Sequence, residues 1–232
     1  MRQAIVVRGG WEGHQPVEAT ELFLPFLRAR GFEVRVEASP EVYADPEVMA
    51  RADLVVPCVT MGEITPEEVE GLRVAVENGT GLVGWHGGVV DSYRGSPAYL
   101  QLVGGQFVAH PMAPIDERAP GAESSRTHAI TFTEQGAAHP VTRGLMDFEL
   151  TTEQYWVATD ELNDVLATTV HPMDPGVPWK RPVTAPAVWA REWGAGRILV
   201  VTPGHDVDML SHPTVRTIIE RGMLWAARTE SE

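Results

Sequence analysis

The sequence predicts an α/β protein organised around one doubly wound, mainly parallel β-sheet with helices on both faces. Short apolar runs rich in β-branched residues alternate with helical segments in the first part of the chain, an order typical of βαβ crossovers. The runs show little polar alternation, as expected for strands buried on both faces. The predicted strands of this sheet cover residues 3–8, 33–37, 53–58, 81–85 and 197–202.

Helix signals separate these strands. A glycine-rich loop and Pro16 precede a predicted helix over residues 17–30, in which Pro25 should produce a kink. Thr65-Pro66-Glu67-Glu68 combines an N-cap, a proline in the first turn and acidic residues, and it opens a helix that reaches Glu77. Shorter or later helical segments are expected at residues 46–50, 96–103 and 213–228.

The second half of the chain has a different pattern and predicts an antiparallel extension of the sheet. Strand-like runs at residues 128–133, 148–157 and 165–169 are separated by polar, proline-bearing loops. Residues 186–193 and 197–202 flank a glycine turn and should form a hairpin that returns to the core sheet. We therefore expect a single domain over residues 1–228, with an insertion-like extension over about 106–180 and a C-terminal tail over 229–232.

Composition and charge narrow the function classes. A formal net charge of −14 makes nucleic acid or an anionic membrane surface an unfavourable partner. The single cysteine, Cys58, cannot form an intrachain disulfide, ends an apolar run and is expected to be a buried small hydrophobe. The single cysteine favours a reducing cytoplasm, and since no apolar stretch is long enough to span a bilayer we expect a soluble protein without a membrane partner.

A tight turn carrying a histidine follows the strand at residues 81–85. Residues 84–88 read G-W-H-G-G, which has the G-x-S-x-G spacing of a nucleophile elbow with His86 in the place of the nucleophile. Glycine tolerates positive φ and close backbone approach, so the turn should be sharp and present His86 outward, at the surface. Imidazole serves in such a position as an acid, a base or a ligand.

Polar residues gather after the predicted strands, at the carboxyl edge where open α/β sheets bind ligands. His86, His205 and Glu153 are the candidate catalytic residues. The candidate substrate-binding residues are Trp11, His14, Trp85, Asp91, Arg94, Tyr155 and Asp206. Tyr155 and Trp156 suit either a sugar-binding face or a core. His139 and His212, each before a proline, are assigned ordinary structural roles, and His110 and His171, also in His-Pro pairs, look similar from their local sequence.

Two kinds of chemistry fit the candidate residues. In the first, two imidazoles and a carboxylate share two tasks: one group removes a proton from the carbon next to a carbonyl, and the others stabilise the resulting enediolate. Alternatively, His14, His86, Glu153 and His205 are ligands suited to a divalent metal such as zinc, with an open position for substrate or water.

The chain resembles the trehalose-utilisation (ThuA-like) family of the class I glutamine amidotransferase-like fold superfamily. The matching segments are GGWEGHQP at residues 9–16, GLVGWHGGVVDSYRGSPAYLQLVGGQFVAHP at 81–111, AHPVTRGLMDFELTTEQYW at 138–156 and VWAREWGAGRILVVTPGHD at 188–206. The resemblance implies a flavodoxin-like sheet and makes His205 the counterpart of the amidotransferase histidine. Amidotransferases have cysteine where this chain has His86, so the resemblance does not extend to glutaminase activity.

The ThuA-like family is associated with bacterial disaccharide catabolism, in routes that oxidise a glycoside to a keto-sugar. The resemblance therefore implies an enzyme of carbohydrate metabolism whose partner is a small-molecule carbohydrate, and the seven tryptophans together with the resemblance favour a homo-oligomer, a dimer. The alternative is a sugar-binding or regulatory module that kept the fold and lost catalysis.

Overall fold

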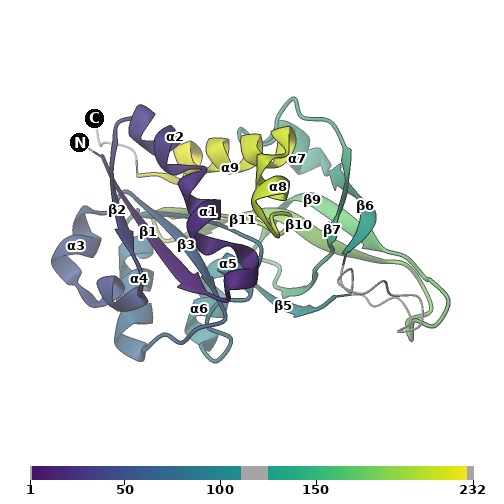
Figure 1. Cartoon of the computed structure of the whole chain (residues 1–232), viewed down its shortest axis with the longest axis horizontal. Coiled ribbons are helices and arrows are strands. Elements are labelled where there is room, and N and C mark those ends of the chain that lie inside the picture. The colour runs from purple at the N-terminus through teal and green to yellow at the C-terminus, as the bar shows by residue number, and fades with distance from the viewer. Residues whose placement is uncertain (1, 111–124, 229–232) are drawn as a thin grey trace.

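A nine-stranded β-sheet forms the centre of the molecule (Figure 1). The structure, a computed structural model, describes residues 2–110 and 125–228. Five neighbouring strands are parallel and confirm the predicted core sheet, in the order β2-β1-β3-β4-β11. They are β2 (Phe32–Glu37), β1 (Arg2–Gly10), β3 (Leu54–Thr60), β4 (Gly81–Trp85) and β11 (Gly196–Val201).

Antiparallel strands continue the sheet from β11, as the sequence predicts for the second half of the chain. They are β10 (Val183–Trp193), β9 (Asp164–His171), β6 (Ser125–Phe132) and β7 (Phe148–Glu153). A separate two-stranded sheet pairs β5 (Gly105–Ala109) with β8 (Trp156–Thr159). The tail expected at residues 229–232 lies outside the described residues.

The single strand predicted over residues 148–157 is wrong, because the chain turns at Gln154 and Tyr155 and enters the second sheet. The Gln154 amide donates hydrogen bonds to Thr169 Oγ1 and to the Val170 carbonyl, at 2.6 and 3.0 Å. Gln154 thus anchors the turn to β9. Alternating apolar residues do not reveal this break, since both halves have strand-like composition.

Helices cover both faces of the parallel half. Alternate residues of β1 point to opposite faces, with Ala4 and Val6 in one buried cluster and Ile5 and Val7 in the other. The first face is covered by α1 (Pro16–Glu21), α2 (Leu24–Ala29), α8 (Val207–Ser211) and α9 (Pro213–Ala226), and α7 (Glu134–Ala138) packs beside β9. The second face is covered by η2 (Pro40–Ala44), α3 (Pro46–Arg51), α4 (Pro66–Glu77) and α6 (Pro97–Val103).

The helix ends follow the local signals. The helix predicted over residues 17–30 is divided into α1 and α2, because Pro25 has no N–H to continue the first helix and instead occupies the first turn of the second. At α4, Thr65 Oγ1 accepts from the Glu68 N–H and the Glu68 carboxylate accepts from the Thr65 N–H, a capping box. No helix of the described part of the chain is long and apolar enough to cross a membrane.

Cys58 lies in the core beneath the elbow, as predicted. Burial raises the pKa of its thiol to about 12, so the side chain stays protonated and unreactive at neutral pH. The thiol therefore cannot replace the nucleophile that the elbow lacks.

Candidate functional site

The elbow predicted at residues 84–88 is present. His86 follows β4 with φ 47° and ψ −141°, a strained conformation for a residue with a side chain, and α5 (Gly87–Val90) begins directly after it. Neighbouring atoms pack so closely against the flanking glycines that a side chain does not fit there. A Cβ on Gly84 would lie 2.6 Å from Val89 Cβ, and one on Gly88 would lie 2.9 Å from Cys58 Cα.

The expectation that this turn presents His86 at the surface is wrong. The side chain is 1 % exposed, and the Tyr155 ring stacks on it with centroids 3.9 Å apart. The segment after β7 and the loop after β1 both fold over the elbow, and neither contact can be anticipated from the turn itself. His86 therefore lies inside a buried cluster.

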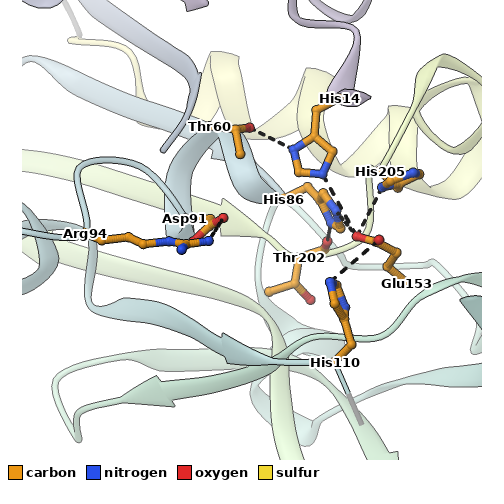
Figure 2. A network of polar contacts seen from close by, with 9 residues as sticks. All are labelled: His14, Thr60, His86, Asp91, Arg94, His110, Glu153, Thr202 and His205. Carbon is orange, nitrogen blue, oxygen red and sulfur yellow. Dashed lines mark hydrogen bonds and ion pairs between the residues drawn. The ribbon is translucent and has the colours of Figure 1, made fainter. Parts of the chain in front are cut away.

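Glu153, the last residue of β7, lies at the centre of that cluster (Figure 2). Its Oε2 atom lies 3.0 Å from His86 Nε2, 3.1 Å from His205 Nδ1 and 4.0 Å from His14 Nε2. His14 ends η1 (Glu12–His14) after β1, and His205 follows β11. One ligand atom from each of the four residues falls within 4.8 Å of every other, so the group has the spacing of a metal-binding set.

Two oxygens outside the cluster orient two of these rings. The Thr202 carbonyl lies 2.8 Å from His86 Nδ1, and because a carbonyl only accepts, Nδ1 must carry the hydrogen. A neutral His86 then directs the lone pair of Nε2 at the Glu153 carboxylate. Thr60 Oγ1 makes the corresponding contact with His14 Nδ1, at 2.8 Å.

Burial controls the charge of the imidazoles. It lowers the pKa of His14 to about 3 and also lowers the pKa of His86 and of His110. The Glu153 carboxylate instead raises the pKa of His205. Nδ1 of His205 is buried and, among the described residues, has no aligned hydrogen-bond partner, although it lies at ion-pair distance from Glu153.

His110 also lies beside Glu153, although it was not among the predicted site residues. It follows β5, and its Nε2 lies 3.6 Å from Glu153 Oε1, the oxygen turned away from the closest histidines. Its ring packs against Phe107 and Tyr155. The available signal was its place in the segment 81–111 that resembles the ThuA-like family, since its own His-Pro context is uninformative.

The predicted substrate-binding residues are spread over different environments. Trp85 lies in the core against Phe23, so its predicted substrate contact is wrong. Asp91 is buried and both its oxygens accept from Arg94, at 2.6 and 2.7 Å, beside the cluster (Figure 2). Asp206 accepts from the Met209 N–H and caps α8.

Trp11 and Tyr155 are the predicted substrate-binding residues whose rings touch the cluster. Trp11 is 48 % exposed and meets the His14 ring edge to face, with centroids 4.7 Å apart. Trp156 instead stacks on the buried His171. His139 and His212 pack against Trp225 and Phe148, in keeping with the structural roles predicted for them.

The fold and the cluster together define an α/β protein whose elbow carries a histidine within a histidine–carboxylate site. The chain belongs to the ThuA family, whose description is trehalose utilisation, and the family model matches residues 3–226. Membership in this family suggests a role in sugar metabolism. No curated protein matches the chain.

Solved structures share the fold. A ThuA-like protein from Bacteroides uniformis has 18 % identity and a TM-score of 0.70, over 96 % of this chain and 89 % of that one. Another from Parabacteroides merdae has 15 % identity and a TM-score of 0.73, over 100 % and 92 %. A protein from Salmonella typhimurium described as cytoplasmic has 15 % identity and a TM-score of 0.62, over 99 % and 100 %.

Gly87→Ala tests how closely the elbow packs on His14. A Cβ at position 87 would lie 2.5 Å from His14 Cε1 and 2.6 Å from Nδ1, and the His14–Thr60 contact leaves the ring little room to move. We expect a loss of roughly 1–3 kcal/mol in the free energy of unfolding, measured by urea denaturation.

Gly95→Ala is the matched control, because a Cβ there meets nothing within 4 Å. Its effect should stay within about 0.5 kcal/mol. If the two variants are equally stable, the packing of His14 on the elbow is not as described.

Proposed function

We propose that His14, His86, Glu153 and His205 bind a divalent metal ion such as Zn²⁺ in an enzyme of carbohydrate metabolism. The observation that carries this proposal is the convergence of one ligand atom from each of these residues, all within 4.8 Å of one another. His86 Nδ1 donates to the Thr202 carbonyl, so the Nε2 lone pair of a neutral His86 points toward Glu153 and would be available to a cation bound between them.

The donor set fits zinc. Three imidazole nitrogens and one carboxylate oxygen are ligands that zinc accepts, and zinc can expand to five ligands, which would leave a position for a substrate oxygen. Burial keeps His14 and His86 neutral, which is the form that binds metal. The Thr202 carbonyl and the Thr60 hydroxyl would provide the outer contacts that fix metal-binding histidines.

We further propose a sugar or keto-sugar as the substrate. The parallel strands have the order β2-β1-β3-β4-β11, open α/β sheets of this kind bind ligands at the carboxyl edge, and the histidines of the cluster lie after β1, β4 and β11. A bound divalent ion would polarise the carbonyl oxygen of a keto-sugar. His110, outside the ligand set, would accept the proton from the neighbouring carbon and later return it, while the negative charge develops on the carbonyl oxygen.

Glutamine hydrolysis is not part of this proposal. The elbow residue is His86, and Cys58, the one thiol of the chain, lies buried below the elbow with a raised pKa. A thioester therefore has no nucleophile to form on.

Glu153→Gln tests the metal site. We expect purified wild-type protein to hold one divalent ion per chain by elemental analysis, and the variant to bind Zn²⁺ at least about 100-fold more weakly in titration calorimetry, because a ligand should matter at least as much as an outer contact. Added Zn²⁺ should raise the melting temperature of chelator-treated wild-type protein but not of the variant.

Glu149→Gln is the matched control, since Glu149 is exposed on the same strand and undergoes the same change of charge. It should bind Zn²⁺ as the wild type does. Wild-type protein that takes up no Zn²⁺, Mn²⁺ or Co²⁺ would contradict the metal site and leave metal-free acid–base chemistry as the explanation of the cluster.

Proton abstraction predicts exchange with solvent. Metal-loaded protein in D₂O should replace the hydrogen on the carbon next to the carbonyl in at least one member of a panel of keto-sugars, followed by proton NMR. His110→Gln should lose this exchange while it retains the metal. Equal exchange by His110→Gln and wild type would remove His110 from proton transfer, and no exchange with any member would contradict the proposed reaction.

We propose that the protein acts in the cytoplasm as a homodimer on a small carbohydrate, without nucleic acid or membrane as a partner. The net charge of −14, the single cysteine and the cytoplasmic description of the Salmonella structure support this setting. Light scattering at micromolar concentration should give twice the mass of one chain. A mass of one chain would rule out the dimer.

A further inference from the structure

Trp11 differs from the other tryptophans in its exposure. All seven tryptophans lie within the described residues, and Trp11 is the one that is largely exposed to solvent, at 48 %. An indole that stays exposed does not gain the large free energy of burying its apolar surface. Its exposure next to the candidate site therefore suggests a functional role.

The Trp11 ring is held in place despite its exposure. The backbone of Gly13 lies directly against its six-membered ring, since a Cβ on Gly13 would come within 2.4–2.7 Å of three ring carbons. His14 meets the ring edge to face, and the backbone N–H of Trp11 donates to the Thr60 carbonyl at 3.2 Å, which fixes the main chain that carries the ring. One part of the ring is therefore covered by the protein, and the remainder is exposed to solvent.

This surface adjoins the metal-binding set. His14, whose ring contacts Trp11, also lies 4.7 Å from the His86 ring and 5.1 Å from the His205 ring, centroid to centroid. The His14 ring thus contacts both the indole and the rings of the cluster, which places Trp11 beside the candidate site.

We infer that Trp11 is a specificity-determining residue that packs on the C–H face of a closed sugar ring, so that the substrate is bound as a pyranose and not in its open-chain form. A pyranose offers several axial C–H groups on one flat face, which matches an indole plane, whereas an open-chain polyol with similar hydroxyls has no such face. This inference rests on the proposed function in one respect, namely that the ligand is a sugar.

The test compares ring and open-chain probes on the purified full chain. The probes are the methyl pyranosides of glucose, galactose and mannose, and the alditols glucitol, galactitol and mannitol, with binding measured by saturation-transfer NMR. Wild-type protein should bind at least one pyranoside roughly tenfold more tightly than its alditol, with saturation concentrated on one face of the ring.

Three variants separate stacking from packing. Trp11→Phe keeps an aromatic plane and should retain the preference for rings. Trp11→Leu keeps an apolar side chain without a plane and should lose the preference. Gly13→Ala leaves the indole in the sequence but pushes it from its position, so it should lose the preference as well.

Three results would overturn the inference: alditols binding as tightly as pyranosides, no pyranoside binding at all, or Trp11→Leu retaining the ring preference. The metal content of each protein separates this inference from the proposed function. Ring preference without bound metal would contradict the metal site alone, and bound metal without ring preference would contradict the role of Trp11 alone.

Discussion

The buried Glu153 carboxylate is the group on which the arrangement of the site depends. It is 7 % exposed, and burying an isolated carboxylate costs several kcal/mol unless other groups compensate it. Imidazole rings surround it from loops that follow β1, β4, β5 and β11, and Tyr155 supports one of them by stacking. Loops that are far apart in the sequence therefore meet around this one carboxyl group.

The site takes its residues from both halves of the sheet. The parallel half brings His14, His86 and His205 to its carboxyl edge, while Glu153 comes from β7 at the far edge of the antiparallel half. The chain crosses back over the elbow because Gln154 ties the turn after β7 to β9. Without the antiparallel strands, the elbow histidine would have no carboxylate to face.

The elbow shows how a fold geometry can serve a different chemistry. The strained backbone and the flanking glycines that would expose a nucleophile are retained, but the side chain they position is an imidazole directed into a buried cluster. Membership in the ThuA family and structural neighbours at 15–18 % identity show that the overall architecture is shared. The chemistry at the elbow depends on the residues present there, namely the His86 imidazole and the Glu153 carboxyl group that faces it.

The sequence by itself determined the parallel strands, the helix caps, the elbow at His86 and the gathering of polar residues at one edge, because these depend on local periodicity, glycine and proline. Only the tertiary structure decided that His86 is buried, that Trp85 belongs to the core and that His110 joins Glu153. Those outcomes depend on contacts between segments far apart in the chain. The neighbours of a residue in sequence do not indicate which distant segment packs against it.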